Sequence, residues 1–182
     1  MNITDRIDQV AHDVTRAALI RGAIRGGFAQ IRPPWAVLEA LFVDSCTRCN
    51  DCAVACPERI ISRGSGGFPV VSFGSGECTF CGVCVAACEV GVLLIERDDA
   101  GVPNTPWSLR IAVAEDCLSI QGVVCRICEE QCDVRAIRFA NPGGLGRPLI
   151  DAARCTGCGA CVAPCPSRSI SLQPTAAEEK AA

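Results

Sequence analysis

The sequence lacks the residues and runs that several large classes of protein require. Its 182 residues include no tyrosine, two tryptophans and a single histidine, so neither a large aromatic core nor a histidine-based active site is indicated. No apolar segment approaches the roughly 18 uninterrupted residues of a membrane span. The net charge of −3 gives no electrostatic footprint for nucleic acid, and no P-loop, dinucleotide fingerprint or nucleophile elbow is present. We therefore expect a protein that is not an enzyme, has no nucleic-acid partner and does not span a membrane.

Cysteine is the residue in excess, with 16 copies. Its commonest spacing, C-x2-C-x2-C-x3-C, is that of the ligand run in bacterial 4Fe–4S ferredoxins, where the fourth cysteine binds a second cluster. One run is stretched, because the seven residues Leu118–Val124 are inserted after its first cysteine. The cysteines form four runs with none left over: Cys46, Cys49, Cys52 and Cys56; Cys78, Cys81, Cys84 and Cys88; Cys117, Cys125, Cys128 and Cys132; Cys155, Cys158, Cys161 and Cys165.

Two other uses of these cysteines are weaker. Zinc also binds C-x2-C pairs, but it needs two pairs that are usually well separated and has no use for four tight runs. Disulfides are disfavoured because no secretory segment is evident and thiols stay reduced in the cytoplasm, where we expect the protein to lie. We therefore predict four 4Fe–4S clusters as cofactors. Metal coordination would supply much of the folding free energy, since aromatic residues make up only 4% of the chain.

The runs belong to an internal repeat. Residues 41–98 and 109–174 each read as strand, cysteine run, hairpin, cysteine run and strand. The gap between runs is 21 residues in the first copy and 22 in the second, whereas 28 residues separate the second run from the third. The sequence therefore predicts an α+β fold of two tandem bacterial-ferredoxin-like modules, each with two 4Fe–4S clusters, preceded by an N-terminal helix.

Sequential pairing of the runs predicts which four cysteines share a cluster. In each module, the fourth cysteine of one run joins the first three of the other. The predicted sets are site 1 (Cys46, Cys49, Cys52, Cys88), site 2 (Cys56, Cys78, Cys81, Cys84), site 3 (Cys117, Cys125, Cys128, Cys165) and site 4 (Cys132, Cys155, Cys158, Cys161).

Five parts are predicted along the chain. Residues 1–40 form a helical arm and a Pro-Pro connector, residues 99–108 a linker and residues 175–182 a flexible tail, with the two modules at 41–98 and 109–174. The arm carries the single histidine, His12, away from the cysteines, and apolar residues on one helical face. It either packs on the modules or docks a partner. Glycine-rich hairpins are expected over 59–73 and 136–150, and short strands at Leu41–Val43, Val92–Ile95, Leu109–Val113 and Ser169–Leu172.

Several segments together are typical of one known family. They are the Ile-Arg-Pro-Pro-Trp connector at 31–35, the segments 46–49, 63–69, 77–81 and 155–161, and the stretched third run. With them the chain resembles the NapF-type ferredoxins of the periplasmic nitrate reductase system over most of residues 31–172. Two features differ from that pattern. Arg16 and Arg21 stand singly where family members often carry paired arginines, and Glu89 and Asp133 follow fourth cysteines where the other two runs have proline.

The resemblance implies a cytoplasmic accessory protein with four 4Fe–4S clusters. It implies an association with the molybdenum-containing catalytic subunit of the nitrate reductase, in its apo or precursor form, for maturation or redox conditioning before export. The residues leave an alternative open, an electron-transfer polyferredoxin that relays electrons to a redox enzyme. The insert Leu118–Val124 is either a tolerated insertion or a recognition surface. The electron donor, the reduction potentials and the oligomeric state are not encoded in these patterns.

Overall fold

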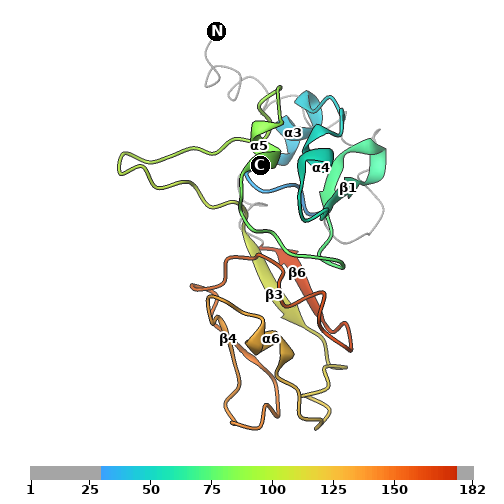
Figure 1. The fold of residues 1–182 in the computed structure, drawn as a ribbon, viewed down its shortest axis with the longest axis vertical. Helices are drawn as coiled ribbons and strands as arrows, with labels where there is room; N and C mark the ends of the chain where they lie inside the picture. The colour runs from blue at the N-terminus through green and yellow to red at the C-terminus, as the bar shows by residue number, and fades with distance from the viewer. Residues whose placement is uncertain (1–29, 176–182) are drawn as a thin grey trace.

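The computed structural model describes residues 30–175 of the chain, which form two lobes stacked end to end (Figure 1). The first lobe contains α3, α4, α5 and β1, and the second contains β3, β6, β4 and α6. The predicted N-terminal helix, His12 and the last residues of the tail lie outside the described part. Within that part, no helix has the length and apolar character needed to cross a membrane.

In the first lobe, two short helices each begin inside a cysteine run. Helix α4 (Asp51–Ala55) contains Cys52, and α5 (Val83–Ala86) contains Cys84. Between them, β1 (Ile61–Arg63) and β2 (Pro69–Val71) pair antiparallel around the 3-10 turn η1 (Ser65–Gly67). The hairpin predicted over 59–73 is thereby confirmed.

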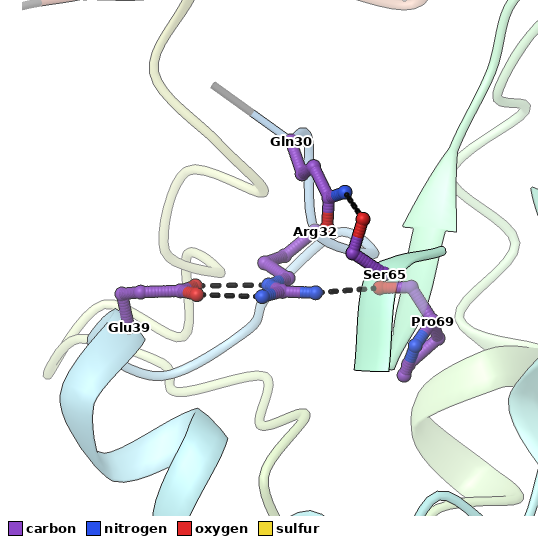
Figure 2. A network of polar contacts seen from close by, with 5 residues as sticks. All are labelled: Gln30, Arg32, Glu39, Ser65 and Pro69. Carbon is purple, nitrogen blue, oxygen red and sulfur yellow. Dashed lines mark hydrogen bonds and ion pairs between the residues drawn. The ribbon is translucent and has the colours of Figure 1, made fainter. Parts of the chain in front are cut away.

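The Pro-Pro connector packs against this hairpin. The Val71 N–H donates to the Ile31 carbonyl at 2.7 Å. The guanidinium of Arg32 lies 5.1 Å from the ring centroid of Phe42 and donates two hydrogen bonds to the Glu39 carboxylate, at 2.6 and 2.9 Å. Its third donor contacts the carbonyl of Pro69 at 3.3 Å (Figure 2). Arg32 therefore holds the connector against the first lobe.

The strand predicted at Leu41–Val43 is wrong, because the helix α3 (Glu39–Ser45) covers these residues. A run of three apolar residues cannot distinguish a strand from one face of a buried helix, and here Phe42 is fully buried on that face. The extended segment lies just upstream of α3. There, Ala36 forms an isolated antiparallel bridge with Leu93.

The segment between the lobes is ordered by its own hydrogen bonds. The strand expected at Val92–Ile95 is limited to the bridge just described, and the chain then forms a loop over 96–104 that projects from the lobes (yellow-green in Figure 1). The Asp98 N–H donates to the Val102 carbonyl at 3.0 Å, and the Asn104 N–H donates to Glu96 at 2.8 Å. A closed hairpin-like loop therefore overlaps the first part of the predicted linker.

The second lobe contains two small antiparallel sheets. Strand β3 (Leu109–Val113) pairs with β6 (Ile170–Pro174), and β4 (Ile137–Arg138) pairs with β5 (Leu149–Ile150). Both the predicted outer strands and the predicted second hairpin are thereby confirmed. The short helix α6 (Ile127–Glu130) carries Cys128 and contacts β4.

The hydrophobic core is shared between the lobes. Leu172 of β6 packs into the core of the first lobe together with Phe42, Phe73 and Leu93. A smaller core around Ile137 and Ile170 fills the second lobe. The two lobes are therefore not packed independently of each other.

Candidate metal centres

In the first lobe, cysteines of the two runs act on one another electrostatically. Burial, followed by the thiolate charges of Cys49, Cys88 and Cys46, raises the pKa of Cys52 to about 11. Burial also raises the pKa of Cys78 to about 11, and the charges that add to this effect include those of Cys81 and Cys56. The fourth cysteine of each run is thus among the charges that act on a cysteine of the other run. Which four thiols make up site 1 and site 2 stays a prediction.

The same exchange occurs in the second lobe. Burial, followed by the charges of Cys117, Cys125 and Cys165, raises the pKa of Cys128 to about 11. Burial raises the pKa of Cys155 as well, with Cys158 and Cys132 among the neighbours that contribute. Cys165 and Cys132 thus each act on a cysteine of the other run, and the ligand sets of sites 3 and 4 also stay a prediction. Because burial disfavours these free thiolates, binding of a metal centre would release protons.

Left-handed backbone shapes the loops that carry these cysteines. In three runs the residues before and after the second cysteine have positive φ, and the third run, whose first cysteine is displaced, lacks this pair. The third residue after each run also has positive φ and donates its N–H to the carbonyl of the run's fourth cysteine. Alternating left- and right-handed residues turn successive N–H groups toward one point, which suits an anionic centre. The residues are Arg48, Asn50, Phe80, Gly82, Gly157 and Gly159 in the first group, and Arg59, Gly91, Arg135 and Arg168 in the second.

Backbone N–H groups reach several of the sulfur atoms. Those of Ala53, Val85 and Glu129 contact the thiol of the cysteine immediately before them and act to lower its pKa, against the larger effect of burial. The Ala136 N–H donates to Cys132 Sγ at 3.2 Å. Such bonds favour a thiolate, the form that binds iron.

The pKa of Cys165 is lowered, unlike the raised pKa values of the cysteines described above. Burial acts to raise its pKa, but hydrogen bonds from the hydroxyls of Ser169 and Ser167, and from the N–H groups of Ser169 and Ile170, lower the pKa overall. Its sulfur lies 3.5 Å from Ser169 Oγ and 3.7 Å from Ser167 Oγ. Sequence analysis did not single out these serines, although their place after the last run was visible.

Exposure of the cysteines differs between the lobes. Cys49 of site 1 and Cys81 of site 2 are exposed, whereas every cysteine of sites 3 and 4 is buried or half-buried. Solvent therefore reaches one corner of each site in the first lobe. The second lobe encloses its sites more completely.

Sites 2 and 4 meet where the lobes touch. The Cys78 N–H donates to the Cys158 carbonyl at 2.8 Å, so the ligand loops of the two lobes are in direct contact. Trp107 donates from Nε1 to the Thr156 carbonyl at 3.2 Å. The Phe73 ring lies so close to Gly159 that a Cβ there would overlap it. Glycine is thus required at this position by packing as well as by its positive φ.

The insert of the third run is fixed to the second hairpin. Ser119 is 1% exposed, and its Oγ lies 2.7 Å from the Gly144 carbonyl and 2.5 Å from the Gly146 carbonyl. The Gly146 N–H donates back to the Ser119 carbonyl at 2.9 Å. At the far end of the insert, Val123 and Val124 are 51% and 67% exposed. The insert therefore has a buried attachment and an exposed apolar end.

The donor set fits an iron–sulfur cluster. It consists of thiols alone, its surroundings are mainly apolar, and N–H groups contact the sulfurs, which are the features that bind and tune such clusters. Among residues 30–175, no three histidine, cysteine or carboxylate side chains are arranged to hold a single metal ion.

Comparison with known proteins identifies the family. The profile of a 4Fe-4S dicluster domain matches residues 45–92 and 123–169, the second match beginning after Cys117. The ferredoxin-type protein NapF of Escherichia coli K12 is 36% identical over 162 residues, which cover 88% of this chain and 95% of that protein. NapF of Haemophilus influenzae is 42% identical over 146 residues, covering 80% of each chain. The methylamine utilization ferredoxin-type protein MauM of Paracoccus denitrificans is 32% identical over 164 residues, covering 82% of this chain and 72% of that protein. The chain therefore belongs to the NapF family of ferredoxin-type iron–sulfur proteins, with two regions of the 4Fe–4S dicluster type.

Proposed function

We propose that the sixteen cysteines are the ligands of four 4Fe–4S clusters, one at each of sites 1 to 4, in two modules at 41–98 and 109–174 joined by a linker at 99–108. The two dicluster matches and the exchange of fourth cysteines between runs support this assignment. When bound, each cluster would accept and release one electron. The chain supplies the thiolates, directs N–H groups at the sulfurs and excludes water from most of them.

We further propose that the protein acts in the cytoplasm as an accessory factor for the molybdenum-containing catalytic subunit of periplasmic nitrate reductase. It would bind the apo or precursor form of that subunit and assist its maturation or redox conditioning before export. The observation that carries this proposal is the similarity to NapF, which extends over 95% of the length of the E. coli protein. The Pro-Pro connector and the stretched third run, which the family resemblance rests on, each have a buried side chain, Trp35 at 7% and Ser119 at 1% exposed.

An electron-transfer relay is the second candidate function. The contact between Cys78 and Cys158 favours it, because this contact brings a site of each module to the junction of the lobes. Exposure of Cys49 and Cys81 would allow electrons to enter or leave through the first module. A relay and a maturation factor differ in the form of the enzyme that they recognise.

The deciding experiment is an anaerobic binding measurement with protein that is fully loaded with iron and sulfide. The ligands are the cofactor-free precursor of the nitrate reductase catalytic subunit and the mature holoenzyme. Tighter binding to the precursor supports the maturation role. Equal or tighter binding to the mature enzyme supports the relay, and binding to neither rejects this client.

A matched pair of variants tests where the client binds. Val123→Glu places a charge at the exposed end of the insert, and Val102→Glu places one on the projecting loop, where valine is 56% exposed. If the insert is a recognition surface, Val123→Glu weakens binding at least tenfold while Val102→Glu leaves it unchanged. Equal effects of the two variants would reject the insert as the docking surface.

A further inference from the structure

The serines after Cys165 distinguish site 3 from the other sites. The second and fourth residues after this cysteine are Ser167 and Ser169. No hydroxyl occupies either position after the fourth cysteine of the other three runs, where the residues are Glu58 and Ile60, Val90 and Val92, and Val134 and Ala136. Of the four equivalent segments of the internal repeat, the one after Cys165 is therefore the one with hydroxyls at these two positions.

Both hydroxyls are directed toward the Cys165 sulfur. Ser169 Oγ lies 3.5 Å and Ser167 Oγ 3.7 Å from Sγ, and the two oxygens are 2.8 Å apart. Ser169 is 4% exposed, so its hydroxyl has little access to bulk water. A buried hydroxyl that lacks a partner is costly, by about 1–3 kcal/mol. When Cys165 is a thiolate it carries no proton, so the hydroxyls are the donors in these two contacts.

A hydrogen bond to a ligand sulfur stabilises the reduced form of a cluster more than the oxidised form. Reduction adds negative charge, part of which resides on the thiolates, and a donor at the sulfur interacts more strongly with that extra charge. Solvent exposure also changes the potential, so the fair comparison for site 3 is site 4. Both sites lie in the second lobe, and neither has an exposed cysteine.

A nearby carboxylate does not cancel this effect. Glu129 directly follows the ligand Cys128 and its negative charge would oppose reduction of site 3. Its carboxylate is paired with the Arg126 guanidinium at 2.8 Å, which neutralises most of that charge. The hydroxyl donors at Cys165 have no counterpart at site 4, but site 4 has N–H donors of its own, from Ala136 and the Gly157–Gly159 loop. The effect of the serines is therefore measured against site 3 without them.

We propose that Ser167 and Ser169 are positioning residues that raise the reduction potential of site 3 above the value it would have without their hydroxyls. The inference rests on the proposed assignment of clusters to the four sites. It deepens the proposed function, because site 3 includes Cys117, from which the insert with its exposed valines begins.

The test is an anaerobic redox titration followed by electron paramagnetic resonance, on the full chain. The variants are Ser169→Ala, Ser167→Ala and the double variant, with Ser171→Ala, at an exposed position of β6, as the control. Iron and sulfide are measured first. A wild-type protein with fewer than four clusters would refute the cluster assignment itself, independently of the serines.

With four clusters loaded, one of the four reduction transitions is expected to move to a more negative potential in Ser169→Ala. It should move further in the double variant, while the other three transitions and the Ser171→Ala control stay at wild-type values. If Ser169→Ala does not load fully, the half-buried Ser167→Ala provides the same test. Unchanged potentials in fully loaded Ser167→Ala and Ser169→Ala, or a positive shift, would overturn the proposal.

Discussion

The Ser119→Ala variant is expected to release the insert of the third run from the second hairpin. Removal of the Ser119 hydroxyl leaves the carbonyls of Gly144 and Gly146 without this donor, and the Gly144 end of the contact is buried. Loss of a buried hydrogen-bond partner costs about 1–3 kcal/mol. Since about 1.4 kcal/mol corresponds to a factor of ten, local opening of the insert should become about 5- to 150-fold more frequent.

Hydrogen–deuterium exchange under anaerobic conditions, read by mass spectrometry, measures this opening without global unfolding. The informative amides are those of Val123 and Gly146, which donate to the carbonyls of Leu118 and Ser119. Peptides containing them should exchange faster by the factor above, whereas those from the first lobe should not change. Ser62→Ala, at an exposed position on β1, is the matched control. Unchanged exchange at Val123 and Gly146 in Ser119→Ala would refute the view that the buried hydroxyl holds the insert.

Three further changes test other parts of the structure. Arg32→Met should lower the thermal unfolding midpoint, because it removes the contacts with Phe42 and Glu39, worth about 1–2 kcal/mol. Arg138→Met, at an exposed position of β4, should leave the midpoint unchanged, and equal midpoints of the two variants would contradict the role given to Arg32. Gly159→Ala should reduce the iron content per chain, measured after anaerobic reconstitution. The new Cβ would overlap the Phe73 ring, and the φ of 87° at this position suits glycine. Full loading of the variant would argue against tight packing where the lobes touch. A ferrous chelator should remove iron in two phases, the first from the sites with exposed cysteines and the slower from sites 3 and 4, as followed by absorbance; a single phase would show that exposure does not limit loss.

Cysteine spacing predicts which runs approach each other, because ligand runs of this kind have little freedom of arrangement. Which four thiols share a cluster stays a prediction. The strands β3 and β6 were also predictable, since each is a β-rich run beside a cysteine run. The helix α3 was not, because its core contact depends on a single buried side chain, Phe42, and its length of seven residues gives too little periodicity. The contact of Cys78 with Cys158 joins residues 80 positions apart and leaves no local pattern.

The left-handed residues after each run could have been found. Aligning the four runs on their fourth cysteines shows Arg, Gly, Arg and Arg at the third following position, at residues 59, 91, 135 and 168. A glycine at one copy of a repeated position indicates a backbone that favours positive φ at all of them. The core shared between the lobes was less predictable. Leu172 lies on β6, and the sequence does not identify the lobe against which this strand packs.

The shared core and the contact of Cys78 with Cys158 also determine when the first module can be completed during synthesis. A ribosome adds residues from the N-terminus, so all cysteines of sites 1 and 2 emerge long before Gly159 covers Phe73 or Leu172 enters the first-lobe core. Until then, the first module exposes apolar surface and a site that solvent can reach from two sides. Co-translational cluster insertion would therefore begin on an unfinished module, and a nascent chain stalled before residue 158 should hold its iron less firmly than the released protein.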